Sequence, residues 1–309
     1  MKKFIILSLF TAIVLLAAGF STPAHAQTPA NDLKPTFISP TPGLYVNGWP
    51  AFTVSYPKEW VEAPLAPGDV FAAGVAHPEV APGACAPLLR IEVIPSVLPL
   101  EDWPKIFMPM IVAMYTDVKV LSDKPSQLKD GTPSRETEAE GVTKEGLKEN
   151  WFSVTTKKDV TWVDVTLTDD KGMISEDLKR IARSLTFQPG REKPVQVPPD
   201  VRAFLDMYCA DFRSGDVNLA MAHFSDRYFE HGSTKARMEQ WFRNDPHFQR
   251  GYTSCEATVT VFEPRGDKAY VDGFFLIKAK GETSAVRVPM YFRQIINEHG
   301  QWKWYGTQK

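Results

Sequence analysis

The sequence predicts an α+β protein built from two domains, and three observations lead to that prediction. The chain has 309 residues, which is more than one small core usually holds. A proline-rich segment without apolar periodicity, residues 189–199, separates its two halves. Within each half, strand-like and helix-like segments occur in blocks instead of alternating one by one. The linker is short and stiffened by proline, so we expect the two domains to lie close together.

The first 26 residues have the pattern of a secretory signal peptide. Lys2 and Lys3 precede the apolar run 4–20, and Ala24-His25-Ala26 supplies a small-x-small cleavage site. We therefore expect cleavage near Ala26 and a periplasmic or secreted product with no membrane segment after cleavage. The alternative is an uncleaved N-terminal anchor. Residues 27–42, rich in Pro, Thr and Ser, predict a disordered leader.

The first domain starts with the strand-like alternation of Phe52, Val54 and Tyr56 and ends with an amphipathic helix. An Asp130-Gly131 turn joins two extended runs between them. In chain order we expect strands within 44–56 and 88–95, a helix over 100–115, strands on both sides of residue 130, a hairpin of 151–156 with 160–167, a helix over 174–184 and a short strand at 185–187.

Three stretches in this half, FTVSYPKEW, LKDGTPSRETE and EDLKRIARSLTF, resemble the PsbP-like family. The resemblance covers roughly residues 37–188, and we place the PsbP-like domain at 43–188. It implies an antiparallel sheet with flanking helices. The shared motifs belong to the framework and imply no chemistry.

The second domain, residues 200–309, begins with three helices and continues with strands. Val201, Phe204, Leu205, Tyr208 and Phe212 share one stripe of a first helix, which Ser214-Gly215 should end. Asp216 is placed to cap a second helix, and a third follows a loop through Gly232. Strands are expected at 257–263, 269–280, 284–297 and 301–305.

The stretches RSGD, HFSDRYFEHGSTK and QWKWYGTQ are similar to the nuclear transport factor 2-like family, also called SnoaL-like. That resemblance implies a curved antiparallel sheet and three helices forming a cone with a pocket for a small apolar ligand. The pocket candidates are Phe204, Tyr208, Phe212, Trp241 and Tyr291.

Enzymes of this fold, the ketosteroid isomerases, suggest catalytic roles to test. Matching the first helix assigns the oxyanion-donating tyrosine to Tyr208. The proton-shuttling carboxylate falls at Gly232 and the second acid falls near Met290 and Tyr291, so two of three roles are missing. His231 is the remaining candidate base. The alternative is that Tyr208 is a packing aromatic and His231 a loop residue.

The composition and the motifs of the sequence argue against several classes of partner. Lys and Arg number 35 against 37 Asp and Glu, and neither half has a basic stripe, so nucleic acid is not an expected partner. No His or Cys pair has zinc-ligand spacing, and no glycine-rich phosphate loop or nucleophile motif is present. We expect no metal site and no cofactor.

The three cysteines allow at most one bridge within the chain. Cys209 and Cys255 lie in the same half and are the disulfide candidate, with Cys85 unpaired. The alternative is three reduced, buried thiols. Trp302 and Trp304 alternate with Lys303 on the last strand. On an outer sheet face they would suit a homodimer or inter-domain docking; on the inner face they would be core.

Together these features predict a periplasmic, non-catalytic binding or accessory protein with a pocket in its second domain. The alternative is a small-molecule isomerase, dehydratase or cyclase that acts in that pocket.

Overall fold

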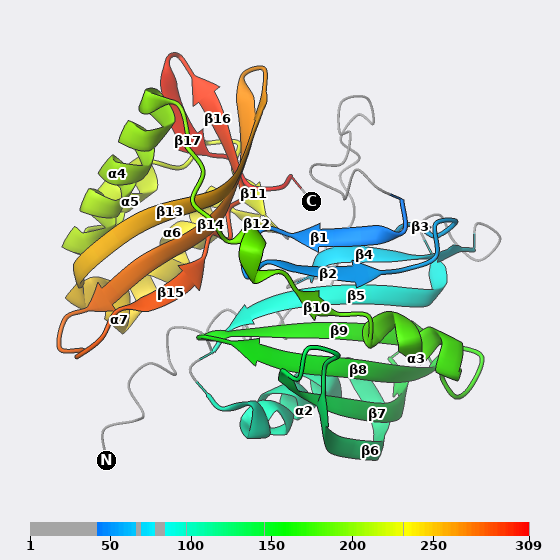
Figure 1. Ribbon diagram of the computed structural model, residues 1–309. Helices are drawn as coiled ribbons and strands as arrows, with labels where there is room; N and C mark the ends of the chain where they lie inside the picture. The colour runs from blue at the N-terminus through cyan, green and yellow to red at the C-terminus, as the bar shows by residue number, and fades with distance from the viewer. Residues whose placement is uncertain are drawn as a thin grey trace. The chain divides into compact units, whose positions relative to one another are not determined.

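The computed structural model describes residues 42–65, 69–77, 84–96, 98–144, 146–230 and 232–308 (Figure 1). Contacts within the chain divide these residues into two compact units. The N-terminal unit comprises 42–47 and 51–189, and the C-terminal unit comprises 48–50 and 190–308. Each unit combines antiparallel strands with helices, which confirms the α+β class.

Two predictions about the N-terminus concern residues that the structure does not describe. The predicted signal peptide, 1–26, and nearly all of the predicted leader, 27–42, lie outside the described residues. None of the described helices is long and apolar enough to cross a membrane.

A seven-stranded antiparallel sheet with the order β3-β4-β5-β9-β8-β7-β6 forms the body of the N-terminal unit. A smaller sheet with the order β1-β2-β10 lies in the same unit. The strands are β1 (Leu44–Asn47), β2 (Phe52–Ser55), β3 (Val61–Glu62), β4 (Asp69–Ala76), β5 (Cys85–Pro95), β6 (Tyr115–Gln127), β7 (Pro133–Thr143), β8 (Lys148–Lys158), β9 (Thr161–Asp169) and β10 (Thr186–Phe187).

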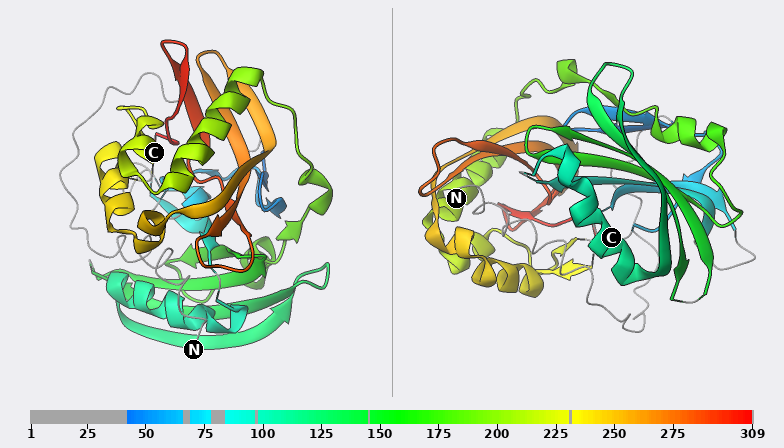
Figure 2. Two further views of the ribbon diagram at one scale, coloured as in Figure 1. Left: turned by 90° about the vertical axis from the view of Figure 1, so that its left-hand side faces the viewer. Right: turned by 90° about the horizontal axis from the view of Figure 1, so that it is seen from below.

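Other elements pack on both faces of the seven-stranded sheet. Successive side chains of a strand point to opposite faces, so one strand contributes to both contacts. Val163 of β9 packs in a cluster with the smaller sheet and with α3 (Glu176–Ala182). Its neighbour Trp162 packs on the other face against α2 (Trp103–Met114), which the short helix η1 (Leu100–Asp102) precedes. Figure 2 shows α2 and α3 on opposite faces of this sheet.

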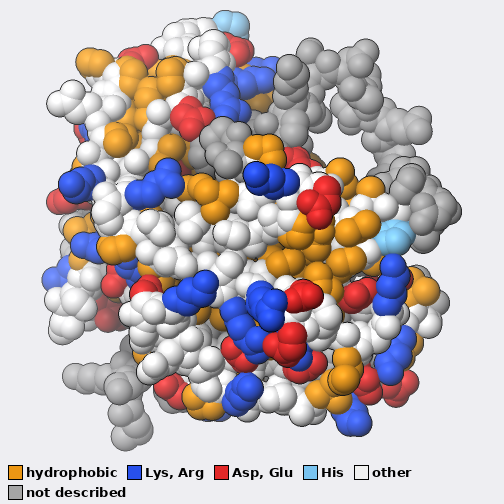
Figure 3. All heavy atoms as spheres, turned by 45° about the vertical axis from the view of Figure 1, so that its right-hand side comes forward, with side chains coloured by type: hydrophobic (Ala, Val, Ile, Leu, Met, Phe, Trp, Pro, Cys, Tyr) orange, Lys and Arg blue, Asp and Glu red, His pale blue; other side chains and the backbone are white. Residues whose placement is uncertain are grey.

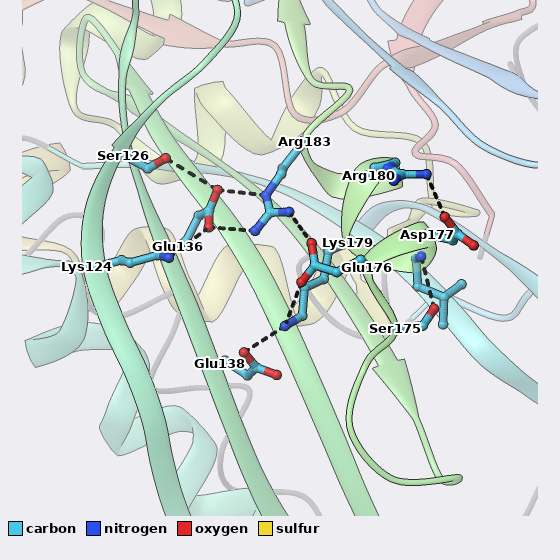
Figure 4. A network of polar contacts seen from close by, with 11 residues as sticks. Lys124, Ser126, Glu136, Glu138, Ser175, Glu176, Asp177, Lys179, Arg180 and Arg183 are labelled. Atoms are coloured by element: carbon cyan, nitrogen blue, oxygen red, sulfur yellow. Dashed lines mark hydrogen bonds and ion pairs between the residues drawn. The ribbon is translucent and has the colours of Figure 1, made fainter.

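Helix α3 is shorter than its predicted span of 174–184 because Ser175 caps it. The Ser175 hydroxyl accepts a hydrogen bond from the Leu178 amide, 3.3 Å away. Ion pairs then attach the helix to β7, as Figure 4 shows. Arg183 contacts both carboxylate oxygens of Glu136, at 2.8 and 2.9 Å, and Lys179 donates to Glu138 at 2.9 Å. On the face drawn in Figure 3, basic side chains are interspersed with acidic ones.

A row of three carboxyl groups crosses neighbouring strands of the same sheet. Asp69 of β4 pairs with Glu92 of β5, which pairs with Asp164 of β9. Asp69 accepts from Arg90, and Asp164 accepts from Thr155 and Thr166 at 2.5 Å each. Burial raises the pKa of Glu92 well above its usual range, and the charges of Asp69 and Asp164 add to that shift. Burial raises the pKa of Asp164 to about 6.

Gly215 and Asp216 end the first helix of the C-terminal unit and start the second. The first helix ends at Gly215, whose φ of 76° allows the left-handed turn that closes it. The Asp216 carboxylate then accepts from the amides of Asn218 and Leu219 and starts the second helix. The helices are α4 (Pro199–Ser214), α5 (Val217–Ala222), α6 (Lys235–Asn244) and α7 (Pro246–Arg250), and the turn η2 (Pro189–Arg191) lies in the predicted linker.

A curled antiparallel sheet packs against these helices (Figure 1). Its order is β13-β14-β16-β17, with β15 paired to β14, and β11 and β12 form a separate antiparallel pair. The strands are β11 (Phe229–Glu230), β12 (Ser233–Thr234), β13 (Tyr252–Arg265), β14 (Lys268–Ala279), β15 (Val286–Pro289), β16 (Gln294–Glu298) and β17 (Gln301–Trp304).

The prediction of one continuous strand over 284–297 is wrong. The structure places β15 and β16 there, separated by residues 290–293. Pro289 ends β15 because it has no amide hydrogen for the ladder, and Arg293 has a φ of 40°, outside the extended range. Met290 and Phe292, which lie in the break, pack in the same core as Val286 and Val288 of β15.

Trp304 belongs to the core of the C-terminal unit. It is 0% exposed and its ring lies 5.1 Å from that of Phe204 in α4. Trp302 is partly exposed, and its indole nitrogen donates to Asp200 at 2.7 Å. The interpretation of these tryptophans as core therefore holds for Trp304, whose side chain offers no docking surface.

Candidate functional site

The interior of the C-terminal unit is an aromatic cluster centred on Tyr208. This tyrosine lies on the buried stripe of α4 and is 2% exposed. Its burial raises the pKa of the phenol. Six rings lie with their centroids between 5.5 and 6.4 Å from that of Tyr208, namely those of Phe212, His223, Phe224, Phe275, Phe292 and Trp304.

A second group of rings extends this cluster toward α6 and α7. Phe212 stacks on Tyr252 of β13, with 4.8 Å between centroids, and lies 5.2 Å from Phe248. Phe242 lies 4.6 Å from Phe248 and 4.9 Å from Trp241. The two groups share Phe212, so one continuous aromatic interior runs from β17 to the α6–α7 junction.

The tyrosine hydroxyls of this interior influence one another. Burial raises the pKa of Tyr228 well above its usual range, and the charges of Glu230 and Tyr208 add to the shift. Burial and then the charge of Asp245 raise the pKa of Tyr252. A phenol whose pKa is raised stays protonated at neutral pH, so these tyrosines act there as hydrogen-bond donors.

Several polar atoms in this interior have no hydrogen-bond partner among the described residues. Buried polar atoms in folded proteins are nearly always paired, and each exception calls for an explanation. The unpartnered atoms of the cluster and its margin are the hydroxyls of Tyr228 and Tyr291, the indole nitrogens of Trp241 and Trp304, and Oδ2 of Asp245.

One acid and one imidazole lie beside the cluster. Nε2 of His223 and Oδ2 of Asp211 are 2.7 Å apart, and this pair joins the end of α5 to α4. The His223 ring meets the Tyr208 ring edge-on, with 5.6 Å between centroids. Both contacts hold the His223 side chain against α4.

The disulfide candidate is present in the structure. Cys209 and Cys255 are bonded, and Cys85 is free. A groove of about 330 Å³ lies beside the bond. Its lining is polar and mixed in charge: Asp206, Cys209, Ala210, Arg213, Cys255, Glu256 and Ala257.

The structure brings the predicted pocket residues into one cluster, although it packs most of them against each other. Phe204 and Tyr208 are buried, and Phe212, Trp241 and Tyr291 are partly buried against the same core. The candidate base His231 lies outside the described residues. Among the described residues, no group of acidic, His or Cys side chains is placed to hold a metal ion.

Sequence reasoning missed several residues of this interior. Tyr228 and Phe292 come from a loop and a strand break, which no single periodicity unites.

Comparison with known proteins gives distant similarities only. No protein-family model matches the chain, and no curated protein sequence matches it. The chain is similar to the cyanobacterial PsbP protein of Synechocystis sp. PCC 6803, with 12% identity and a TM-score of 0.36 over 52% of this chain and 100% of that one.

Two further solved structures are similar at the same level. One is a Pseudomonas aeruginosa protein of unknown function, with 13% identity and a TM-score of 0.26, covering 41% of this chain and 81% of that one. The other comes from Bacteroides thetaiotaomicron VPI-5482, with 10% identity and a TM-score of 0.34, covering 84% and 88%. At these TM-scores the similarities carry no argument about function.

Proposed function

We propose that the C-terminal unit binds a small, mainly apolar molecule that carries oxygen acceptors. The observation that carries this proposal is a set of hydrogen-bond donors, inside an aromatic cluster and at its margin, that have no partner among the described residues: the hydroxyls of Tyr228 and Tyr291 and the indole nitrogens of Trp241 and Trp304. Binding sites for small molecules combine apolar walls with a few polar groups in this way.

The chemistry of these groups indicates the ligand. An indole N–H only donates, and a protonated phenol donates readily, so the ligand has to present oxygen lone pairs. Each buried donor without a partner costs about 1–3 kcal/mol, which a ligand acceptor would relieve. Aromatic rings supply the contact area for an apolar body.

The proposal also includes the predicted export of the protein and the predicted families of its two domains. An exported protein is consistent with the Cys209–Cys255 disulfide, because such bonds persist in oxidising compartments. We assign an accessory role to the N-terminal unit as a PsbP-like domain and a nuclear transport factor 2-like cone to the C-terminal unit. Docking through the C-terminal sheet stays a prediction. The isomerase, dehydratase or cyclase alternative also stays a prediction, because its candidate base His231 lies outside the described residues.

Thermal shift with acetophenone and ethylbenzene tests the binding function. A ligand that binds the folded state raises stability by RT ln(1 + [L]/Kd), so the ketone should raise the melting temperature saturably and more than the hydrocarbon. Tyr228→Phe and Tyr291→Phe remove only hydroxyls and should weaken the ketone's effect. Tyr56→Phe, in the N-terminal unit, is the control and should change nothing. No shift with either compound at saturating concentration would contradict the proposal.

A further inference from the structure

The groove of about 330 Å³ beside the disulfide lies between α4 and β13, and both elements line it. Helix α4 runs beside β13, the end strand of the C-terminal sheet (Figure 1). The Arg202 guanidinium of α4 donates to the Ala257 carbonyl of β13 at 2.9 Å. Cys209 and Cys255 are only 4% and 8% exposed, and both line the groove. The groove is therefore the side from which a small molecule reaches their bond.

Charged side chains flank the disulfide along α4. Asp206, Cys209 and Arg213 follow one another at spacings of three and four residues, so they lie on one face of the helix. Arg213 is exposed, and within the described part of the chain its guanidinium makes no hydrogen bond or ion pair. The Asp206 carboxylate lies 3.9 Å from Arg202, in a loose pair. One cation and one anion are thus open to solvent on either side of the cysteine.

Strand β13 adds a second carboxylate. Glu256 directly follows Cys255 and is exposed, and among the described residues its side chain has no hydrogen bond or ion pair. Ala210 and Ala257 complete the lining, and their small side chains leave the space between the charged groups open. The lining therefore combines one guanidinium, two carboxylates and a disulfide.

We infer that this groove binds a small zwitterionic thiol, a molecule with a thiol, a carboxylate and an ammonium group, and that its thiol exchanges with the Cys209–Cys255 bond. The Arg213 guanidinium would pair with the carboxylate, and Asp206 or Glu256 with the ammonium group. These two contacts would hold the ligand's sulfur beside the disulfide. The inference is independent of the ligand proposed for the aromatic interior.

The exchange is balanced over two steps. The ligand thiolate attacks Sγ of one cysteine, so that a new S–S bond forms while the Cys209–Cys255 bond breaks, and the released cysteine thiolate takes up a proton. A second ligand thiolate attacks the ligand sulfur of this mixed disulfide and releases the other cysteine. Two ligand thiols are oxidised to one disulfide, and their two electrons and two protons reduce the protein bond. The covalent tie between α4 and β13 is then open.

Four thiols separate the contributions of the charged groups. Cysteine has both charged groups, 3-mercaptopropionate has only the carboxylate, cysteamine has only the ammonium group, and 2-mercaptoethanol has neither. Each attacking thiolate is negative, so 2-mercaptoethanol measures how a substitution acts on the thiolate itself. The ratio of a variant's rate to the parent's rate, taken for each thiol, removes the intrinsic reactivity of that thiol.

The test measures the loss of the intact bond in the folded full chain with each thiol in excess. Acid quenching, alkylation with N-ethylmaleimide and peptide mapping follow the bond and distinguish it from Cys85. Arg213→Gln should slow cysteine and 3-mercaptopropionate by about 3-fold to 5-fold relative to 2-mercaptoethanol, which is the upper end for an exposed ion pair. The same substitution should not slow cysteamine.

The carboxylates should have the opposite selectivity. Asp206→Asn/Glu256→Gln should slow cysteine and cysteamine relative to 2-mercaptoethanol and should not slow 3-mercaptopropionate. Arg243→Gln is the matched control for the arginine, because its guanidinium pairs with Glu239 on α6, and it should change none of the four rates.

Urea below the unfolding transition distinguishes attack in the groove from attack on unfolded protein. Reaction at the folded bond should change little with such urea, whereas reaction through unfolding accelerates steeply because the unfolded population rises with urea. A steep acceleration in the parent would overturn the inference. Variant ratios that are the same for all four thiols would overturn it too, since the groove would then recognise neither charged group.

Discussion

Cys209 in α4 and Cys255 in β13 lie with their Cα atoms 5.2 Å apart and are joined by a disulfide. Cys209 is the residue next to Tyr208, so the bond ties the centre of the aromatic cluster to the curled sheet. The two cysteines are 46 positions apart in the sequence. A bond across that separation restricts the unfolded chain more than the folded one.

Loss of this bond should destabilise the C-terminal unit. The chain-entropy relation gives about 4 kcal/mol for a loop of this length, and we expect Cys209→Ala/Cys255→Ala to lower the free energy of unfolding by about that amount. Urea unfolding measures it. Cys85→Ala is the control and should leave the value nearly unchanged. If peptide mapping of unreduced protein finds all three thiols alkylated, the bond is absent in solution.

The Tyr208 side chain should contribute to stability through its ring more than through its hydroxyl. Tyr208→Phe keeps every ring contact and should change the free energy of unfolding by about 1 kcal/mol or less. Tyr208→Ala empties the centre of the cluster and should cost about 3–5 kcal/mol. Denaturant unfolding of both variants checks this; similar losses in the two would show that the hydroxyl, and not the ring, is the essential group.

Glu92 should make the N-terminal unit less stable as the pH rises. Its folded pKa is raised, so the folded protein keeps a proton that the unfolded chain releases above its ordinary pKa. The contribution of protonated Glu92 to the free energy of unfolding is therefore fully present below about pH 4.5, and it is lost as the pH rises toward the folded pKa.

Glu92→Gln removes that loss and should raise the free energy of unfolding at pH 7 by an amount on the order of 1 kcal/mol, with little gain at pH 4. Unfolding curves at both pH values measure the difference. Glu59→Gln, at an exposed position, should show no such pH dependence. A variant less stable than the parent at pH 7 would mean that ionised Glu92 is favourable in the fold.

Arg183 should stabilise α3 in a pH-dependent way. Hydrogen bonds from Arg183 are the largest cause of the lowered pKa of Glu136. A lowered folded pKa contributes stability above the ordinary pKa of a glutamate, and that contribution is lost as the pH falls through the folded pKa.

Arg183→Gln should therefore cost about 1–3 kcal/mol at pH 7, because Glu136 is 8% exposed and loses its bidentate partner. The cost should shrink at pH 3. Arg180→Gln breaks an exposed pair with Asp177 and should stay within about 0.5 kcal/mol at both pH values. Equal effects of the two substitutions would rule out a special role for Arg183.

The sequence by itself determined the features that depend on neighbouring residues. Helix α4 and its end at Gly215 follow from an apolar stripe and a residue that tolerates positive φ, and Asp216 caps α5 as its side chain predicts. The β8–β9 hairpin with Trp162 and Val163 on opposite faces follows from alternation. The α+β class followed from the order of these elements.

Only the tertiary structure decided which distant residues meet. It broke the expected strand after Pro289, and it brought Phe292 against Tyr208, a contact between segments far apart in the sequence. It also left buried polar atoms of the aromatic interior, such as the Tyr228 hydroxyl, without a hydrogen-bond partner among the described residues. Local propensity arises from interactions along the chain, whereas burial and hydrogen-bond satisfaction depend on groups brought together from far apart, so the candidate site became visible only in three dimensions.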